Sequence, residues 1–162
     1  MKITGKCISC SKRTQGRKSN SSFICRKCKL IKESEDKLQL LKNLCLFDFG
    51  WLVGIIEGEG CFYCKKSKCK LKDGVYCYPL SGFTVMSTDH DVMIKVSNLL
   101  ELRLNGPYYS EEKRKKVWSI QVTGNIVTVI MKYFYSQLSK RRQKQIDEAI
   151  EWQSRKRFKC SH

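Results

Sequence analysis

Residues 46–58 are the segment that most restricts how this chain can fold. They are apolar on nearly all sides, which predicts a helix buried against more than one neighbour. Gly54 and Gly58 are four residues apart and therefore lie on one face of that helix. Because glycine carries no side chain, this face lets the backbone of a second helix approach closely. The sequence thus predicts a helix that pairs with another helix.

Two acids lie at the end of this helix. Glu57 and Glu59 sit where the helix dipole is already negative, so we expect a cation to compensate their charge. Carboxylate oxygens are the ligands that Mg²⁺ prefers. If two copies of the helix pair, their Glu59 carboxylates meet, and mutual repulsion favours metal capture further. A helix that simply ends in Gly-Glu-Gly with a solvated acid is the alternative.

The pattern downstream predicts single helices alternating with pairs of strands. β-Prone runs at residues 61–72 and 75–87 surround Asp73-Gly74, a strong hairpin signal. The later expected elements are a helix at 88–102, strands at 107–112 and 115–123, and helices at 126–138 and 140–153. This order, helix, two strands, helix, two strands, helices, indicates an α+β fold.

Residues 52–60, Leu-Val-Gly-Ile-Ile-Glu-Gly-Glu-Gly, resemble the signature of the LAGLIDADG homing endonucleases, and the element order over residues 43–153 is similar to their core. The resemblance implies an αββαββα core whose curved antiparallel sheet forms a saddle over the DNA major groove. It also implies that the signature helix forms the dimer interface. The residues expected there are Trp51, Gly54, Ile55 and Gly58. With one motif per chain, we expect a homodimer and a near-palindromic site in double-stranded DNA.

The resemblance further implies a metal-dependent nuclease site. Glu59 takes the place of the last acid of the motif, which is most often Asp in the family, and is expected to bind catalytic magnesium. Glu57 matches an earlier acid with a structural role near the helix end. The implied reaction is metal-assisted hydrolysis of a phosphodiester bond on each strand.

Other catalytic positions follow from the same resemblance. Ser87 or Asp89 occupies the end of the second strand, where the family often places a polar residue near the reacting phosphate. Lys140 and Arg142 match a segment that supplies a basic residue to position water or stabilise the phosphate. A solvated start of the last helix explains these two basic residues equally well.

Basic residues follow the predicted hairpins. Alternation along a strand directs one set of side chains to one face, here into the DNA groove. The residues expected to contact DNA are Lys65, Lys66, Lys68, Lys70, Lys72, Lys113, Arg114 and Lys115. The net charge of +17, from 32 Lys and Arg against 15 Asp and Glu, also indicates a polyanionic partner.

Two cysteine pairs lie near the start of the sequence. Cys7-x-x-Cys10 and Cys25-x-x-Cys28 have a spacing close to that of a zinc ribbon. Two tight turns bring four thiolates to about 2.3 Å from one tetrahedral ion, so a zinc ion held there would be structural. Four unligated thiols in a basic arm are the alternative.

The composition divides the chain into segments. Residues 1–32 hold ten Lys or Arg and no Asp or Glu, and they cannot build a core unaided. The expected division is a zinc-ribbon-like module at 1–33, a connector helix at 34–45, the endonuclease core at 46–154 and a basic tail at 155–162. Because the sequence contains neither a spanning apolar stretch nor a secretory signal, we expect no membrane partner, an intracellular location and reduced or metal-bound cysteines.

Two other functions remain as alternatives. An intron maturase or transcription regulator on the same scaffold needs the charge and the saddle but not the acid at Glu59. An interaction protein with no nucleic-acid partner leaves the charge of +17 unexplained.

Overall fold

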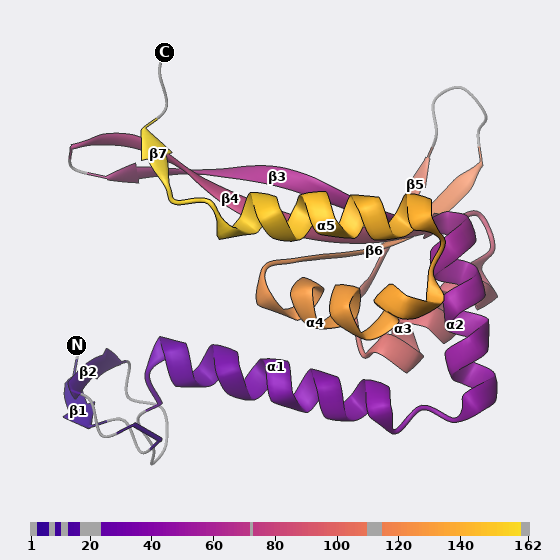
Figure 1. Ribbon diagram of the computed structural model, residues 1–162, viewed down its shortest axis with the longest axis horizontal. Helices are drawn as coiled ribbons and strands as arrows, with labels where there is room; N and C mark the ends of the chain where they lie inside the picture. Colours follow the sequence, from indigo (N-terminus) through magenta and orange to yellow (C-terminus); the bar gives the residue numbers. More distant parts are fainter. Residues whose placement is uncertain are drawn as a thin grey trace.

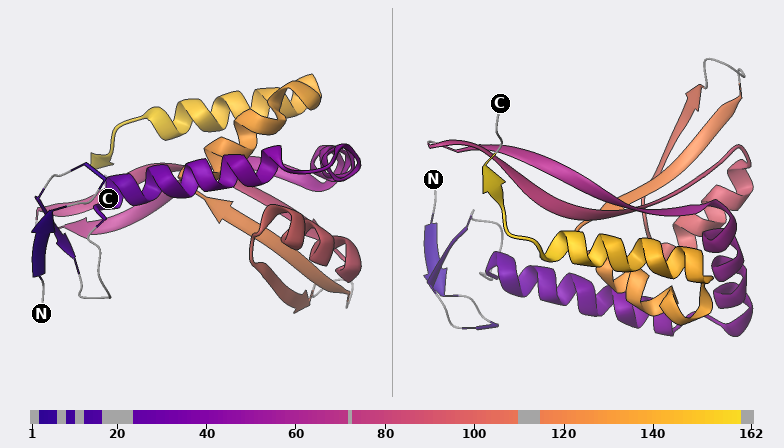
Figure 2. Two further views of the ribbon diagram at one scale, coloured as in Figure 1. Left: turned by 90° about the horizontal axis from the view of Figure 1, so that it is seen from below. Right: turned by 45° about the horizontal axis from the view of Figure 1, so that its top comes forward.

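A curved antiparallel sheet with helices on one face forms the main body of the protein (Figures 1 and 2). The computed structural model describes residues 3–6, 9–10, 13–16, 24–71, 73–109 and 115–159. From residue 46 to residue 154, helices and strands alternate in the order that the sequence predicts. The expected α+β architecture is therefore confirmed.

Two hairpins build the sheet. Its strands are β3 (Gly60–Leu71), β4 (Gly74–Ser87), β5 (Leu104–Tyr109), β6 (Lys116–Thr123) and β7 (Phe158–Lys159), while β1 (Ile3–Lys6) and β2 (Arg13–Gly16) pair separately. The order across the sheet is β3-β4-β6-β5, and β7 pairs with β4. β3 and β4 keep one register from Gly60 opposite Val85 to Leu71 opposite Gly74. Gly74 has a φ of 140°, which side chains rarely permit, and this explains the Asp-Gly turn signal.

The helices lie close to their predicted positions, with one exception. They are α1 (Arg26–Lys42), α2 (Leu46–Glu59), α3 (His90–Leu100), α4 (Asn125–Phe134) with the 3₁₀ turn η1 (Tyr135–Gln137), and α5 (Lys140–Ser154). The predicted connector at 34–45 is part of a longer helix, because α1 already begins at Arg26, where the Cys25 sulfur accepts a hydrogen bond from the Cys28 N–H. Among the described residues no single helix is long and apolar enough to span a membrane. α1 and α2 taken together have the required length and composition, but the chain bends by 111° between them.

The hydrophobic core lies between the sheet and the helices. Its fully buried side chains include Leu41 from α1, Leu52 and Ile56 from α2, Phe83 and Val85 from β4, Ile120 from β6, Phe134 from α4 and Ile146 from α5. Phe62 and Phe83 stack on neighbouring strands with ring centroids 5.1 Å apart. Because side chains alternate along a strand, the residues between these core positions form the opposite, helix-free face of the sheet.

Candidate active site

The C-terminal end of α2 carries two acids with different surroundings. The Glu57 carboxylate accepts hydrogen bonds from the backbone N–H of Ser139 at 3.0 Å and from its hydroxyl at 2.8 Å, and Arg141 Nη2 lies 3.5 Å away. The backbone hydrogen bond from Ser139, assisted by the hydroxyl and by Arg141, lowers the pKa of Glu57. Glu57 is therefore an anionic link between the end of α2 and the start of α5.

Glu59, two residues further on, is the last residue of α2, and its side chain is exposed. Within the described part of the chain its carboxylate has no hydrogen bond and no ion pair. Gly60 then turns the chain into β3, and a Cβ at this position would lie 2.5 Å from the Ile56 carbonyl oxygen. The turn thus requires glycine, and it holds an available carboxylate at the junction of helix and strand.

Arg142 is bonded to the same helix end. Its guanidinium donates to the Glu57 carbonyl at 2.9 and 3.2 Å and to the Gly58 carbonyl at 3.3 Å, and its side chain is buried. These are carbonyls that a helix terminus leaves without partners inside the helix. The sequence suggested a phosphate contact for Arg142, but its Nε and Nη2 donate to the backbone of α2 and its Nη1 donates to the Gln145 side chain at 3.0 Å. Arg142 therefore binds the C-terminal end of α2 at the two residues before Glu59.

The other predicted catalytic residues lie nearby. Lys140 is exposed at the first residue of α5, next to the Ser139 cap. Ser87 ends β4, two residues beyond Val85, the strand partner of Gly60. Its hydroxyl accepts a hydrogen bond from the Asp89 N–H at 3.1 Å, and the Asp89 carboxylate caps α3. Of the two residues proposed for this position, Asp89 is thus committed to a helix cap.

The face of α2 that carries its glycines is open. A Cβ placed at Gly50, Gly54 or Gly58 would meet no described atom within 4 Å. These glycines follow at intervals of four residues and form one continuous strip, which we call the glycine face. Gly54 and Gly58 were predicted from the sequence to lie on this face; Gly50 was not, although it has the same spacing.

Large apolar side chains lie on the same helix. Leu46 is 86% exposed and Phe47 is 73% exposed, whereas Trp51 and Ile55 are half-buried. The Lys95 ammonium lies 4.4 Å from the ring centroid of Trp51. Exposed apolar side chains beside a strip without side chains are typical of a helix that packs against another helix.

The lysines of β3 lie on two different faces. Phe62 points to the helices, so Lys66, Lys68 and Lys70 share its face by alternation, and the Lys66 ammonium lies 5.9 Å from the Trp152 ring centroid of α5. Lys65 lies on the helix-free face. Thus the alternation predicted from the sequence exists, but it directs most of these lysines to the side of the helices.

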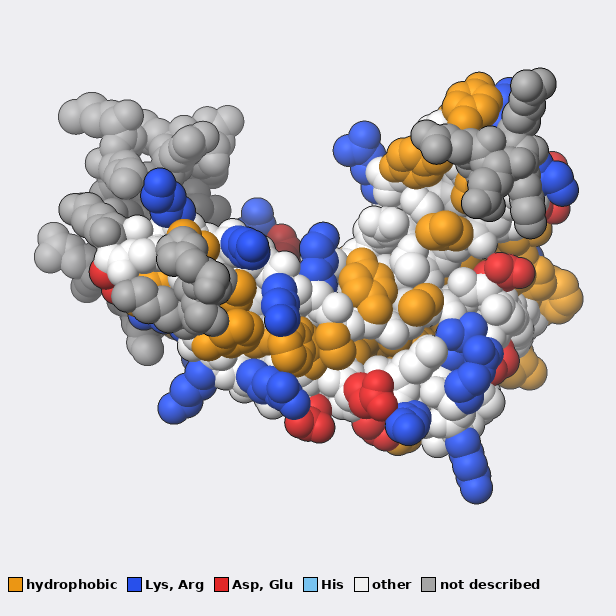
Figure 3. All heavy atoms as spheres, turned by 90° about the horizontal axis from the view of Figure 1, so that it is seen from above, with side chains coloured by type: hydrophobic (Ala, Val, Ile, Leu, Met, Phe, Trp, Pro, Cys, Tyr) orange, Lys and Arg blue, Asp and Glu red, His pale blue; other side chains and the backbone are white. Residues whose placement is uncertain are grey.

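Four other basic residues were predicted from the sequence to contact DNA. Lys115 is exposed just before β6. Lys72, Lys113 and Arg114 lie outside the described residues. A space-filling view shows Lys and Arg on either side of a band of hydrophobic side chains (Figure 3).

The helix-free face also contains a cavity of about 390 Å³. Its lining residues are Met86, Tyr108, Tyr109, Val117, Ser119 and Gln121. Near it, the buried Oγ1 of Thr84 has no hydrogen-bond partner among the described residues. These positions were not predicted from the sequence, because they come from three strands and meet only through the strand register.

Three of the predicted zinc ligands lie together. The sulfurs of Cys10, Cys25 and Cys28 are within 4.8 Å of one another, and Cys10 Sγ is 3.7 Å from Cys25 Sγ. Four thiolates at about 2.3 Å from a tetrahedral zinc ion are about 3.8 Å apart, so this donor set fits zinc. The fourth predicted ligand, Cys7, lies outside the described residues. Elsewhere, Cys77 is disulfide-bonded, unlike the reduced thiol expected from composition.

A family model described as LAGLIDADG endonuclease matches residues 52–152. One similar solved structure is the archaeal intron-encoded homing endonuclease I-Vdi141I complexed with DNA, with 16% identity, a TM-score of 0.43, and coverage of 62% of this chain and 63% of that chain. Another is a mutant of I-SmaMI, with 16% identity, a TM-score of 0.44, and coverage of 63% and 37%. The matched region thus spans less than two thirds of either protein. No curated protein sequence matches the chain.

Proposed function

The chain belongs to the LAGLIDADG endonuclease family, and we propose that it is a homing endonuclease that cuts double-stranded DNA at a specific site. The observation that supports this proposal most directly is the exposed carboxylate of Glu59 beside the glycine face of α2. The same helix thus offers a pairing surface and an available metal ligand. Both are needed when two subunits each supply one acid to a shared site.

We propose that the active form is a homodimer paired through the glycine face. Leu52 and Ile56 are fully buried in the chain's own core, so the opposite side of α2 is available for a second copy. Close approach of the two helix backbones requires the absence of side chains at Gly54 and Gly58. A two-fold axis between the helices relates the two Glu59 carboxylates, and the expected DNA target is therefore near-palindromic.

Glu59 of each subunit is the proposed ligand for Mg²⁺. Its exposed carboxylate, which has no partner in the described part of the chain, fits an oxygen-seeking cation. When bound, the metal supplies charge neutralisation and Lewis acidity at the scissile phosphate and makes water a better nucleophile. Glutamate is one methylene longer than the aspartate usual in the family and remains a competent ligand.

Four other residues have separate proposed roles. Arg142 holds the backbone of α2 so that Glu59 stays at the helix end. Lys140, exposed beside this end, is the proposed basic group near the phosphate, and Ser87 is the proposed polar group at the end of β4. Lys65 on the helix-free face is the proposed phosphate contact of the first hairpin.

The N-terminal segment is proposed to be a small structural zinc module, with Cys7 as the fourth ligand beside Cys10, Cys25 and Cys28. Thiolate ligands suit zinc, and four of them leave no open coordination position for catalysis. The ten basic residues in 1–32 are suited to nonspecific phosphate contacts that extend the DNA footprint. The core then comprises residues 46–154, with a basic tail at 155–162.

A DNA-binding protein without cleavage is the competing function. Such a protein needs the net charge of +17 and the curved sheet but gains nothing from an exposed acid at the end of α2. The presence of Glu59 therefore favours cleavage over binding alone.

The test is a cleavage selection on randomised double-stranded DNA with Mg²⁺. The wild-type protein is expected to cut a rare, near-palindromic sequence, and Glu59→Gln is expected to bind that sequence without cutting it. Glu148→Gln, at an exposed acid of α5, is the matched control and should cut normally. Normal cutting by Glu59→Gln would refute the role of Glu59, and binding without any cutting by the wild type would favour the competing function.

A further inference from the structure

The N-terminal end of α1 coincides with the cysteine cluster. Cys25 is the N-cap of this helix, and its sulfur accepts a hydrogen bond from the Cys28 N–H at 3.5 Å. Cys10 Sγ lies 3.7 Å from the same sulfur. A cation held by these sulfurs would therefore fix the first turn of α1 directly. Since the start of a helix is the costly step in its formation, a fixed first turn favours the whole helix.

The opposite end of α1 is anchored in the core. Leu41 is fully buried, and its carbonyl accepts a hydrogen bond from the Tyr133 hydroxyl of α4 at 2.8 Å. Lys37 is only 8% exposed, and its ammonium donates a 2.6 Å hydrogen bond to the Leu100 carbonyl at the end of α3. Burial lowers the pKa of Lys37. This half of α1 thus contacts α3 and α4. Its separation from them would expose Leu41 to water and break the hydrogen bonds of Lys37 and Tyr133.

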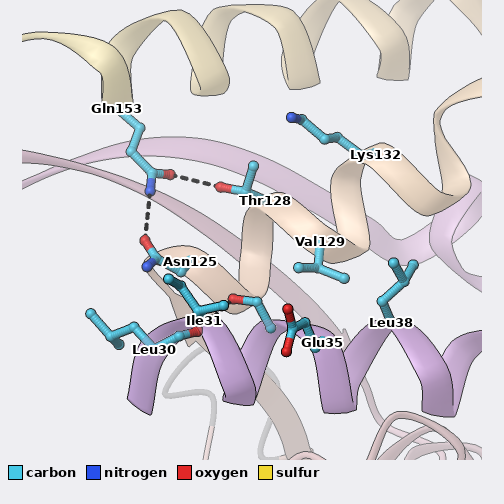
Figure 4. A pocket seen from close by; sticks show the side chains of 10 residues that line it. Leu30, Ile31, Glu35, Leu38, Asn125, Thr128, Val129, Lys132 and Gln153 are labelled. Atoms are coloured by element: carbon cyan, nitrogen blue, oxygen red, sulfur yellow. Dashed lines mark hydrogen bonds between the residues drawn. The ribbon is translucent and has the colours of Figure 1, made fainter. Parts of the chain in front are cut away.

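Between its two ends, α1 is only loosely packed. A groove of about 460 Å³ separates Leu30, Ile31 and Leu38 of α1 from Thr128 and Val129 of α4 (Figure 4). Above it, the Gln153 side chain of α5 accepts a hydrogen bond from Thr128 at 3.1 Å, so this polar group is satisfied without α1. In the part of the chain that the structure describes, the residues of the N-terminal half of α1 are exposed or half-buried, so the contacts at its first turn are important for holding it.

We propose that zinc held by Cys10, Cys25 and Cys28 stabilises the core through α1, so that the metal site and the core fold as one cooperative unit. This inference rests on the zinc site of the proposed function and goes beyond it. A free-standing finger would be joined to the core by a flexible connector. Here the helix that begins at the metal ligands ends inside the core, and the binding free energy of the metal becomes folding free energy of both parts.

The test uses the full-length protein, stripped of metal and titrated with Zn²⁺. All three tryptophans of the chain, Trp51, Trp118 and Trp152, lie in α2, β6 and α5, so their fluorescence reports unfolding of the core alone. At free zinc about 100-fold above its dissociation constant, the midpoint of the tryptophan transition should rise by roughly 5 to 10 °C. Zinc binding that leaves this midpoint unchanged would overturn the coupling, and failure to bind zinc would overturn the site.

Three variants distinguish zinc binding from the effect of zinc on the stability of the core. Cys28→Ser should abolish the zinc-dependent rise, whereas Cys69→Ser, at an exposed cysteine of β3, should keep it. Glu35→Pro interrupts α1 between the cysteines and the core, and it should retain zinc binding, followed by cobalt–thiolate absorption, while losing the rise. A rise that persists in Glu35→Pro would contradict transmission through α1. None of these readouts involves DNA, so their failure is distinct from failure of the endonuclease assignment.

Discussion

The carboxylate of Glu57 and the backbone N–H of Ser139, 82 residues apart in the chain, form a 3.0 Å hydrogen bond that joins α2 to α5. The Ser139 hydroxyl donates to the same carboxylate at 2.8 Å while it accepts from the Arg142 N–H at 3.5 Å. One acid of the Glu-Gly-Glu segment is thereby committed to the fold. The other, Glu59, keeps its carboxylate exposed for a cation.

Replacing Glu57 should make stability less dependent on acid pH. The hydrogen bond from the Ser139 N–H lowers the pKa of Glu57 below its usual 4.5. The anionic form is thus favoured by folding, and its stabilisation is full above pH 4.5 and disappears as pH falls through the lowered value. Glu57→Gln should cost up to about 1 kcal/mol at pH 7 and nothing in strong acid. Urea unfolding at a series of pH values measures the difference in unfolding free energy between the wild type and Glu57→Gln, with Glu148→Gln as control. The same difference at every pH would contradict a role for the Glu57 charge.

Substitution of Gly54 should separate folding from dimerisation. Since a Cβ at Gly54 meets no described atom within 4 Å, Gly54→Ala should stabilise the isolated chain by about 0.5–1 kcal/mol through better helix propensity. The same change, and more strongly Gly54→Leu, should weaken self-association and cleavage. Sedimentation and thermal unfolding at low concentration test both effects. Lys144→Leu, at an exposed position of α5, is the control and should leave self-association unchanged. A dimer that is unaffected by Gly54→Leu would rule out the glycine face as the interface.

Arg142 should prove to be a positioning residue. Arg142→Met leaves the carbonyls of Glu57 and Gly58 without their buried donor, and the loss of such charge-assisted bonds costs about 2–3 kcal/mol. We expect a lower midpoint in urea and a reduced cleavage rate, with DNA affinity nearly unchanged. Arg141→Met, at a side chain that is 65% exposed, should cost less than about 1 kcal/mol. A normal stability together with weakened DNA binding would instead indicate that Arg142 contacts phosphate.

Lys65 and Lys68 form a matched pair for mapping the DNA surface. Both are exposed on β3, but Lys65 lies on the helix-free face and Lys68 on the face of the helices. Lys65→Ala should weaken DNA binding several-fold and lower the slope of log K against log salt by about 1. Lys68→Ala should change affinity much less. Titrations at several salt concentrations provide the comparison, and a larger effect at Lys68 would show that DNA does not lie on the helix-free face.

The local features of the fold could be predicted from the sequence because they depend on near neighbours. The spacing of Gly54 and Gly58 indicates a helix face, and Asp73-Gly74 marks a hairpin through the φ that Gly74 must adopt. Hydrophobic periodicity located α3, α4, α5 and the strands of the two long hairpins for the same reason, whereas β1, β2 and β7 were not predicted. The start of α1 was missed because the sulfur of Cys25, read as a metal ligand, is also a helix cap.

Contacts that form only in the folded protein give residues of the same type different roles. Glu57 and Glu59 are the same residue type and lie two positions apart at the end of α2, and the difference comes from Ser139, which lies 82 residues beyond Glu57 in the chain and contacts it only in the folded protein. Likewise, the face on which Lys65 lies follows from which alternate residues of β3 are covered by helices. Periodicity specifies that faces exist, but contacts between distant segments, set by packing and register, determine which face is buried and which acid remains available.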